Sequence, residues 1–385
     1  MINRVDIEQR ERETLAGYAA LAAESRGRVY PLKEHPLRTA FQRDRDRVVH
    51  AAAFRRMEFK TQVFLPHVAD HFRTRLTHTI EVAQVARTLA RNLRLNEDLT
   101  EAIALVHDVG HTPFGHAGED VLNDLLADTG GFNHNRQSLR VVDFLEHRYR
   151  EHPGLNLSFE VREGIVKHET SVQQDDSDFA PGMWPTLEAT LVDKADSLTY
   201  SAHDIDDGLN SGLITLSDID ELGIWKLEGG GEPFSFDRSG FRTLDDDQKR
   251  YQVVRYLINA TASDLLRETS RRLETYSIAS LDDVRRAPER LCRYSESVAE
   301  GVTELRWFLR EHLYRHPKLL DHTARAREII EVLFSRLCDD SGLLPPRYQE
   351  MLLTEPTEVV AADYIAGMTD RFAERLFVQL KRKTG

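Results

Sequence analysis

Apolar residues recur every three or four positions along nearly the whole chain, and no stretch alternates apolar and polar residues as a half-buried strand would. This is the period of amphipathic helices, which bury one stripe of side chains against a core. The 385 residues and the hydrophobic content of 41% are enough for one large domain or two ordinary ones. The pattern therefore predicts an all-α protein with a sizeable core.

The expected helices form two groups on either side of a loop-rich segment. The first group covers about 76–95, 99–109, 117–128, 134–148, 158–168 and 185–209. The segment 213–248 contains the run GGGEP at 229–233 and is expected to be an irregular excursion with room for a short hairpin. The second group covers about 249–275, 287–314, 322–339 and 357–382.

All residues with candidate chemistry precede residue 210, which suggests four functional regions. We expect an N-terminal helical segment at 1–60 that contributes to the site, a catalytic core at 61–212, the loop-rich excursion at 213–248 and a C-terminal helical region at 249–385. The C-terminal region is interpreted as scaffold, lid or oligomer interface.

The net charge of −13 argues against broad nonspecific nucleic-acid binding, because the field of the whole molecule repels phosphates. One stretch differs from this average. Between Arg26 and Lys60, ten Lys or Arg residues face four Asp or Glu residues, a net charge of +6. This stretch is either a solvated helix face or a surface that steers anions.

Cysteine usage and hydropathy narrow the class of protein further. Cys292 and Cys338 have no paired spacing, so neither a disulfide framework nor a thiolate zinc site is expected, and any metal must use His and carboxylates. No apolar run approaches the roughly 18–20 residues needed to cross a bilayer, and the N-terminus is charged. We expect no membrane partner and a cytoplasmic location.

Residues 107–119 read HDVGHTPFGHAGE, which places three histidines, an aspartate and a glutamate within thirteen positions. His107 and Asp108 end an apolar segment, so their side chains diverge by about 100° yet both can reach a metal beyond the helix end. Gly110 and Gly115 let the backbone turn sharply there. A lone buried histidine is usually a hydrogen-bonded core residue, but a cluster this dense indicates a metal or catalytic site.

Two other segments supply candidate ligands. His78 lies on the preceding expected helix, and a helix-turn-helix hairpin would bring it beside His107. Asp196, Tyr200 and Asp204 recur at i, i+4 and i+8 and therefore line one stripe of the expected helix 185–209. This polar stripe is either a solvated outer face or the wall of a cleft, and its place at the border of an apolar stripe favours the cleft.

The candidate metal ligands are two imidazoles and two carboxylates, His78, His107, Asp108 and Asp196. Such a set suits Mn, Fe, Co, Ni, Zn or, less naturally, Mg. A divalent ion lowers the pKa of bound water and offsets charge on a phosphoryl oxygen, and both effects favour hydrolysis of a phosphate ester near neutral pH. His116 and Glu119 stand three residues apart, and we interpret them as an acid/base pair.

The order H…HD…D at 78, 107, 108 and 196 resembles the HD-domain phosphohydrolase superfamily, whose fold is all-α. Longer segments are similar to the deoxyguanosine triphosphate triphosphohydrolase family. They are KTQVF at 60–64, DHFRTRLTHTIEVAQVAR at 70–87, HDVGHTPFGHAGE at 107–119, GGFNHNRQSLR at 130–140, VREGIVKHE at 161–169 and ADSLTYSAHDIDDGL at 195–209. Together with a similar stretch from Lys33 to Phe64, these motifs cover more than half of the chain. Ser197 and Leu198 depart from the residues of many relatives but leave the ligands intact.

The resemblance implies an HD-domain helical fold with additional C-terminal helices and hydrolysis of a deoxynucleoside triphosphate, dGTP included, to the deoxynucleoside and triphosphate. It implies a divalent cofactor (Mn, Mg or another first-row transition metal) held by the four ligands named above. His116, Glu119 and His111 are assigned to catalysis, with His111 and His134 near the α-phosphate; Gln62, Tyr200 and Asp204 are assigned to the deoxyribose, and Arg75 to phosphate. It also implies a homo-oligomer, hexameric in some members, and an allosteric nucleotide.

Two rival functions remain open. One is another HD hydrolase, acting on nucleoside monophosphates or a signalling nucleotide. The other is a nucleotide-sensing regulator or a single-stranded DNA-binding protein that keeps the site mainly for binding. The pair His116 and Glu119 weighs against the second rival, because a protein that only binds needs no acid/base couple.

Overall fold

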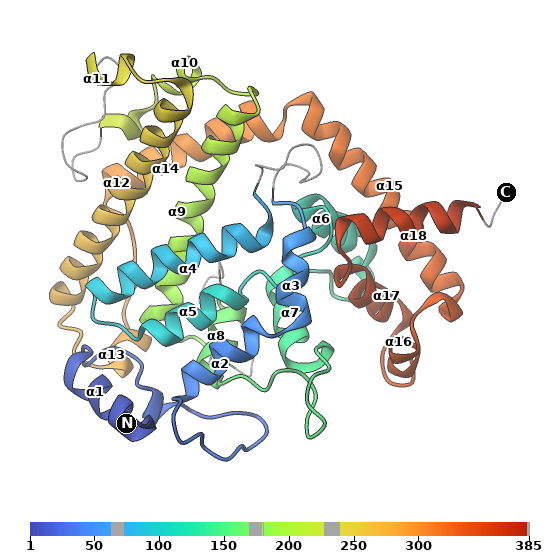
Figure 1. Cartoon of the computed structure of the whole chain (residues 1–385), viewed down its shortest axis with the longest axis horizontal. Coiled ribbons are helices and arrows are strands. Elements are labelled where there is room, and N and C mark those ends of the chain that lie inside the picture. Colours follow the sequence, from blue (N-terminus) through green and yellow to red (C-terminus); the bar gives the residue numbers. More distant parts are fainter. Residues whose placement is uncertain (63–72, 169–178, 180, 227–238, 383–385) are drawn as a thin grey trace. The chain divides into compact units, whose positions relative to one another are not determined.

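The computed structural model describes residues 1–62, 73–168, 179, 181–226 and 239–382, which form helices joined by turns and loops (Figure 1). Within these residues the isolated bridges are Arg28 with Ser158 and Thr61 with Thr74. The predicted all-α fold is confirmed. Over the same residues, no helix has the length and apolarity that a bilayer crossing requires.

The helices up to residue 210 carry all residues predicted for the site except Gln62 and the loop residues at 107–111. The α-helices are α1 (Arg4–Thr14), α2 (Ala40–Val49), α3 (Ala52–Arg56), α4 (Arg75–Asn92), α5 (Glu97–Val106), α6 (Gly115–Leu125), α7 (His134–Arg140), α8 (Phe159–Val166) and α9 (Leu187–Asn210). Short 3₁₀ or π turns are η1 (Ala22–Glu24), η2 (Met57–Phe59), η3 (Ala127–Thr129) and η4 (Val141–Leu145).

The remaining helices follow the loop-rich segment. They are α10 (Leu216–Ile219), η6 (Gly223–Lys226), α11 (Ser239–Arg242), α12 (Asp246–Thr275), α13 (Leu281–Arg285), α14 (Glu296–Leu309), η7 (Arg310–Tyr314), α15 (Pro317–Asp339), η8 (Ser341–Leu343), α16 (Pro346–Met351), α17 (Thr357–Ala366) and α18 (Asp370–Arg382). The hairpin expected at 229–233 lies outside the described residues.

The chain divides into two compact units, each assembled from three separated segments. Unit 1 comprises Met1–Asp46, His78–Leu105 and Leu157–His316. Unit 2 comprises Arg47–Thr77, Val106–Asn156 and Pro317–Gly385. Three of the five boundaries between the segments fall inside α2, α4 and α5.

Unit 1 is built around α9, which packs against α12, α8 and α14. The helix starts at Thr186, whose hydroxyl accepts the Ala189 N–H and satisfies one of the free amides of the first turn. Leu191, Leu198 and Ile205 lie on its buried side. Because α9 is packed along its length, the polar side chains that it carries are held on a fixed frame.

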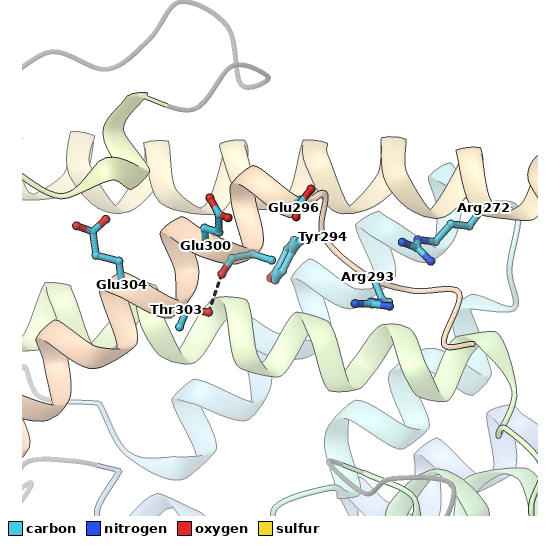
Figure 2. Close-up of a pocket in the computed structure, with 8 residues that line it drawn as sticks. Arg272, Arg293, Tyr294, Glu296, Glu300, Thr303 and Glu304 are labelled. Carbon is cyan, nitrogen blue, oxygen red and sulfur yellow. Dashed lines mark hydrogen bonds between the residues drawn. The ribbon is translucent and has the colours of Figure 1, made fainter. Parts of the chain in front are cut away.

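A cavity of about 780 Å³ lies along α14 in unit 1 (Figure 2). Glu296, Glu300 and Glu304 line it at four-residue intervals, with Arg272 and Arg293 further along. None of the residues predicted for catalysis or binding lines this cavity, so it is separate from the predicted site.

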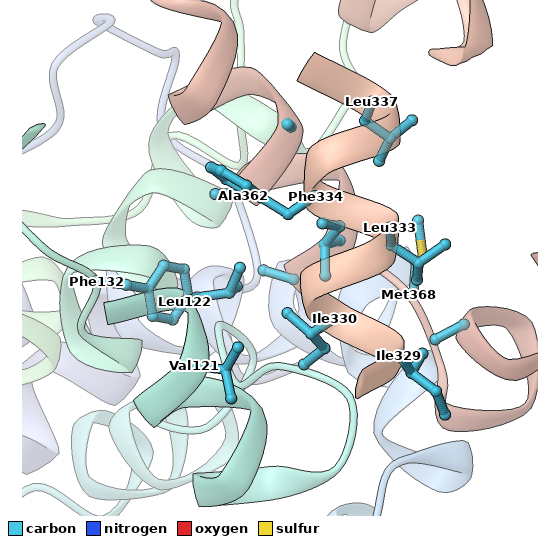
Figure 3. Packing of buried hydrophobic residues seen from close by; sticks show 14 of the residues in the cluster. Val121, Leu122, Phe132, Ile329, Ile330, Leu333, Phe334, Leu337, Ala362 and Met368 are labelled. Atoms are coloured by element: carbon cyan, nitrogen blue, oxygen red, sulfur yellow. The ribbon is translucent and has the colours of Figure 1, made fainter. Parts of the chain in front are cut away.

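Unit 2 has a core in which α6 packs against α15, and α15 packs against α17 and α18. Val121 and Leu122 of α6 meet Ile330 and Leu333 of α15 in this cluster (Figure 3). Phe114, the residue before α6, belongs to the same cluster. The helix that begins one residue before His116 is therefore fixed by a helix from the C-terminal part of the chain.

Two expected helices differ from the observed ones because of proline and glycine. The expected helix 287–314 begins only at Glu296, since Pro288 interrupts the chain after α13. The expected helix 357–382 is two helices, because α17 ends before Gly367 and α18 starts at Asp370. A third, expected at 322–339, starts earlier, at Pro317, where proline suits the first turn.

Three arginines of the basic stretch between Arg26 and Lys60 form ion pairs within unit 1. Arg28 pairs with the buried carboxylate of Asp44, and Arg38 pairs with Asp46. Arg45 lies 2.7 Å from Asp98. These pairs reduce the positive charge available to steer an anion.

Candidate active site

The loop after α5 is packed tightly against α7 in unit 2. Ser138 of α7 donates its hydroxyl to the His107 carbonyl at 2.8 Å and accepts the Gly110 N–H at 2.9 Å. A Cβ atom at Gly110 would overlap the backbone nitrogen of Ser138, so only glycine permits this approach. The loop position of His107 and Asp108 is therefore fixed by backbone contact with the helix that starts at His134.

Asp108 is a buried carboxylate with three basic neighbours in unit 2. Arg75 donates from Nη1 to Asp108 Oδ2 at 2.7 Å, and Asp108 Oδ1 lies 3.0 Å from His111 Nδ1 and 3.5 Å from His107 Nε2. Burial opposes the charge, but His111, His107 and Arg75 outweigh it and hold the pKa of Asp108 well below its usual value. Asp108 is therefore ionised, and its carboxylate oxygens can bind a metal ion.

His111 is a neutral imidazole in the same cluster. Burial and the nearby Arg75 charge hold its pKa well below the usual value, so the ring keeps a nitrogen lone pair at neutral pH. It stacks on His134, with ring centroids 3.9 Å apart. Asp108, His111 and His134 each offer a ligand atom within 4.8 Å of the others, so this group could also hold a metal ion.

Glu119 contacts three groups of the cluster. It accepts the His134 backbone N–H at 2.8 Å, it lies 2.9 Å from His134 Nδ1, and its Oε2 lies 3.4 Å from His116 Nδ1. Burial opposes the charge, but hydrogen bonds from His116 and His134 outweigh it and hold the Glu119 pKa well below its usual value. The His116 side chain is 57% exposed, so an anionic carboxylate lies beneath an accessible imidazole.

The remaining predicted ligands lie in unit 1. His78 Nε2 is 2.8 Å from Asp196 Oδ1. His168 Nε2 is 3.4 Å from Asp196 Oδ2. On the other side of the His78 ring, Nδ1 lies 3.2 Å from His203 Nδ1. Unit 1 alone thus brings the His78 nitrogen and the Asp196 oxygen, both possible metal ligands, close together.

These donor pairs fit a divalent cation. An ion in octahedral coordination with bonds of about 2.1 Å places adjacent ligand atoms about 3 Å apart. The pairs His78–Asp196 at 2.8 Å in unit 1 and His111–Asp108 at 3.0 Å in unit 2 match that separation. Carboxylate oxygens and neutral imidazole nitrogens are also the donor types that such ions take in proteins.

The residues assigned to the sugar and to phosphate are buried or half-buried. On α9, Asp204 accepts a hydrogen bond from the Tyr314 hydroxyl, and Tyr200 lies edge-on to His78 with ring centroids 6.2 Å apart. In unit 2, Gln62 Oε1 is buried without a hydrogen-bond partner among the described residues. Arg75 is 1% exposed, and its Nε and Nη2 likewise find no partner in the described part of the chain.

Three residues of these clusters did not stand out in the sequence. His168 and His203 are lone histidines, one after α8 and one inside α9, and Tyr314 lies more than 100 residues after the motifs. Both histidines lie in segments that resemble the family, VREGIVKHE at 161–169 and ADSLTYSAHDIDDGL at 195–209, and this was the signal that could have suggested them. No local signal distinguishes Tyr314.

Comparisons with known proteins agree with this arrangement. Residues 75–201 match the HD domain family, and residues 292–379 match the phosphohydrolase-associated domain. A deoxyguanosinetriphosphate triphosphohydrolase-like protein of Geobacter sulfurreducens is 46% identical over 99% of this chain and 100% of its own length.

Proteins of the same description from two other bacteria are similar to this chain. The Azoarcus protein is 50% identical over 93% of this chain and 94% of its own length. The Thiobacillus denitrificans protein is 48% identical over 94% of this chain and 96% of its own length. The chain belongs to the HD-domain family of deoxyguanosinetriphosphate triphosphohydrolase-like proteins.

Proposed function

We propose that this protein hydrolyses deoxynucleoside triphosphates, dGTP included, to the deoxynucleoside and triphosphate, with a divalent metal ion as cofactor. The observation that carries the proposal is the cluster in unit 2 that combines ionised Asp108, neutral His111 and the pair His116 and Glu119. Membership of a family named for this reaction supports it.

The proposed metal ligands are His78, His107, Asp108 and Asp196, and Mn, Mg or another first-row transition metal is the proposed ion. When bound, the ion offsets charge on the phosphoryl oxygens and lowers the pKa of water. Support comes from the donor types and from the separations within each unit, 2.8 Å for His78–Asp196 in unit 1 and 3.0 Å for Asp108–His111 in unit 2.

Arg75 is proposed to bind a phosphate oxygen. Its Nη1 is held by Asp108, which fixes the plane of the guanidinium, and Nε and Nη2 find no hydrogen-bond partner among the described residues. Buried guanidinium donors are costly without acceptors, and a phosphate oxygen would satisfy them by charge-assisted hydrogen bonds. The group is therefore pre-oriented for an anion.

His116 is proposed as the general acid. Water attacks the α-phosphorus and loses a proton to solvent, the bond from phosphorus to the 5′ oxygen breaks, and His116 delivers a proton to that oxygen. The anionic Glu119 lies 3.4 Å from His116 Nδ1 and orients the ring, and His111 and His134, whose rings stack, are proposed to face the α-phosphate. The leaving group is then the deoxynucleoside, and the three phosphates stay together.

The deoxyribose is proposed to contact Gln62, Tyr200 and Asp204. Asp204 is held by the Tyr314 hydroxyl, so its carboxylate is oriented before substrate arrives. A close contact of this kind at C2′ leaves no room for the extra hydroxyl of a ribonucleotide. We therefore expect deoxynucleotides to be preferred over their ribo counterparts.

The test is to separate by chromatography the products from each deoxynucleoside triphosphate and its ribo counterpart, with Mn or Mg, singly and in mixtures. We expect a deoxynucleoside and intact triphosphate, and in ¹⁸O-labelled water the label should enter triphosphate only. Turnover in mixtures but not with single nucleotides would indicate an activating nucleotide. Orthophosphate from monophosphates would favour another HD hydrolase, and no turnover in any mixture would favour the binding regulator.

His116→Ala is the matched catalytic test. Turnover should fall about 100-fold, in the range of a lost general acid, while the metal content of the protein stays nearly the same. Loss of metal in proportion to turnover would show that His116 is a ligand or a structural residue. His322→Ala, on the exposed side of α15, serves as the control for removal of a histidine.

A further inference from the structure

The loop between His111 and His116 contains a backbone conformation that side-chain-bearing residues rarely adopt. Phe114 has φ 64° and ψ 22°, and Gly115 has φ 60°, so the residue before α6 and the first residue of α6 both have positive φ. A non-glycine residue stays in this region only where its surroundings hold it there. The surroundings of Phe114 therefore determine where the loop presents its histidines.

Those surroundings come from the C-terminal helices of unit 2. Asp370, the first residue of α18, accepts the Phe114 N–H on Oδ1 at 2.9 Å. Its other oxygen accepts the Thr61 N–H at 2.9 Å and the Thr61 hydroxyl. Asp370 is 2% exposed, so this carboxylate serves the two segments and not solvent. The ring of Phe114 is also buried in the cluster formed by α15, α17 and α18.

Lys60 makes the reciprocal connection. Its Nζ donates to the carbonyl oxygen of His111 and to that of Ala366, the last residue of α17, at 2.8 Å for the latter. The loop is thus held at a carbonyl by Lys60 and at an amide by Asp370, three residues apart. Both anchors involve the junction between α17 and α18.

The helix that begins at His134 is tied to the same C-terminal region. Asp363 of α17 accepts hydrogen bonds from Gln137 Nε2 at 2.9 Å and from Arg140 Nε at 2.8 Å. Asp363 is 2% exposed. Each segment of unit 2 that carries a histidine of the cluster is therefore fixed by a buried carboxylate from the region that matches the phosphohydrolase-associated domain.

We propose that Asp370 is a positioning residue that holds the left-handed turn at Phe114 and thereby orients His111 and His116. The phosphohydrolase-associated region then helps to position the histidines of the site, because displacement of α18 would release the turn. The effect on turnover rests on the proposed function, whereas the ordering of the loop does not. The two can be measured separately.

The experiment compares Asp370→Asn with Glu374→Gln in the full chain. Asparagine keeps one acceptor oxygen and replaces the other with an N–H₂ group, so the Phe114 N–H and the two Thr61 donors must share a single acceptor and the anchor of the loop is weakened. Glu374 lies four residues along α18 and is half-buried, so its substitution removes the same charge without touching the loop. Each variant is examined by amide hydrogen exchange, melting temperature, metal content and steady-state kinetics.

For Asp370→Asn we expect exchange in the peptide 107–119 to become at least about 10-fold faster while that of α12 is unchanged, since local opening is selective. We expect kcat to fall about 10- to 100-fold with KM within about 3-fold and metal content unchanged, the pattern of displaced catalytic groups. Glu374→Gln should match the wild type in all four measurements.

Unchanged exchange at 107–119 would overturn the proposal, whatever the kinetics show. So would faster exchange throughout unit 2 with kcat reduced only by the unfolded fraction, since that is the signature of general destabilisation. If the wild type hydrolyses no nucleotide, the exchange result alone decides the positioning role. If Asp370→Asn does not fold, Asp370→Glu keeps the charge but moves both acceptor oxygens by one methylene group, and the same local increase in exchange is required.

Discussion

Buried ionisable side chains in this protein keep or lose their charge according to the partners around them. Asp108 has basic neighbours and stays ionised. Glu11 of α1 is buried with an amide partner only, since its Oε2 accepts the Ala22 N–H at 2.8 Å. Burial, only partly offset by that bond and by Asn96, raises the pKa of Glu11 to about 7.

The pKa of Glu11 predicts a pH dependence of stability. The folded-state pKa of Glu11, about 7, lies above its unfolded value of 4.5. The contribution of Glu11 to the free energy of unfolding is therefore largest below pH 4.5 and is lost as the pH rises toward 7. Glutamine cannot ionise, so Glu11→Gln removes this loss. The change in the free energy of unfolding that it causes should be more favourable at pH 8 than at pH 4.5 by about 1–2 kcal/mol. Denaturant unfolding at both pH values measures it. Glu13→Gln, exposed on the same helix, should show no such difference, and equal effects of the two variants would refute the assignment.

His203 predicts a change in metal affinity. Its Nδ1 lies 3.2 Å from His78 Nδ1 and its Nε2 lies 2.5 Å from a Glu81 oxygen, so it connects a carboxylate to the proposed ligand. Groups that fix the orientation of a ligating imidazole typically contribute 10- to 100-fold to affinity. His203→Ala should weaken Mn binding about 10-fold in a competition titration. Affinity equal to that of the wild type would mean that His78 is oriented by other contacts.

At this scale, the sequence revealed the residues that stand in dense or ordered patterns. The run 107–119 and the stripe from Asp196 to Asp204 could be recognised from the sequence because such patterns rarely occur by chance. Lys60 begins the segment KTQVF at 60–64, but its role could not be predicted, and Asp370 lies in no such segment. The two residues are more than 300 positions apart, and only the packing of unit 2 shows that both hold the same loop.

Among the elements, long periodic helices were predictable and their ends were not. The helix expected at 185–209 is α9, Leu187–Asn210, because its apolar stripe and its Thr186 cap agree. The helix expected at 134–148 ends its regular part at Arg140 and continues only as the π turn η4 to Leu145. Boundaries depend on capping and tertiary contacts that periodicity does not contain.

The contact between α6 and α15 yields a prediction at the level of elements. Leu333 of α15 is fully buried in the unit 2 core, so Leu333→Ala removes packed methyl groups and leaves a cavity. The free energy of unfolding should fall by about 2–5 kcal/mol in a denaturant titration. Leu320→Ala, half exposed on the same helix, should cost less than about 0.5 kcal/mol. Similar costs for the two would show that α15 does not pack on α6 as described.

For the whole molecule, the interleaved segments mean that the region matching the HD domain is not self-sufficient. Unit 2 joins 47–77 and 106–156 to 317–385, and unit 1 joins 1–46 and 78–105 to 157–316. The contacts within each unit join segments that are far apart in the sequence. Sequence periodicity carries no information about which distant helices pair.

This organisation predicts the behaviour of a fragment. A polypeptide of residues 75–201 lacks Asp363, Asp370 and α15, so the apolar face of α6 has nothing to pack against. We expect its thermal unfolding, followed by circular dichroism, to be broad and non-cooperative, and we expect it to bind an apolar dye that the full chain excludes. A sharp transition and no dye binding would show that the HD region folds independently.

The bond from Thr61 to Asp370 spans 309 positions of the chain. During synthesis at roughly 5–20 residues per second, the segment that contains Thr61 waits about 15–60 seconds for its partner to be made. Over that interval the apolar faces of α6 and α7 are without their covering helices. We expect factors that shield apolar surface at the ribosome to bind the nascent chain during this interval. Slow codons between residues 157 and 316 would lengthen the time for which these apolar faces are exposed.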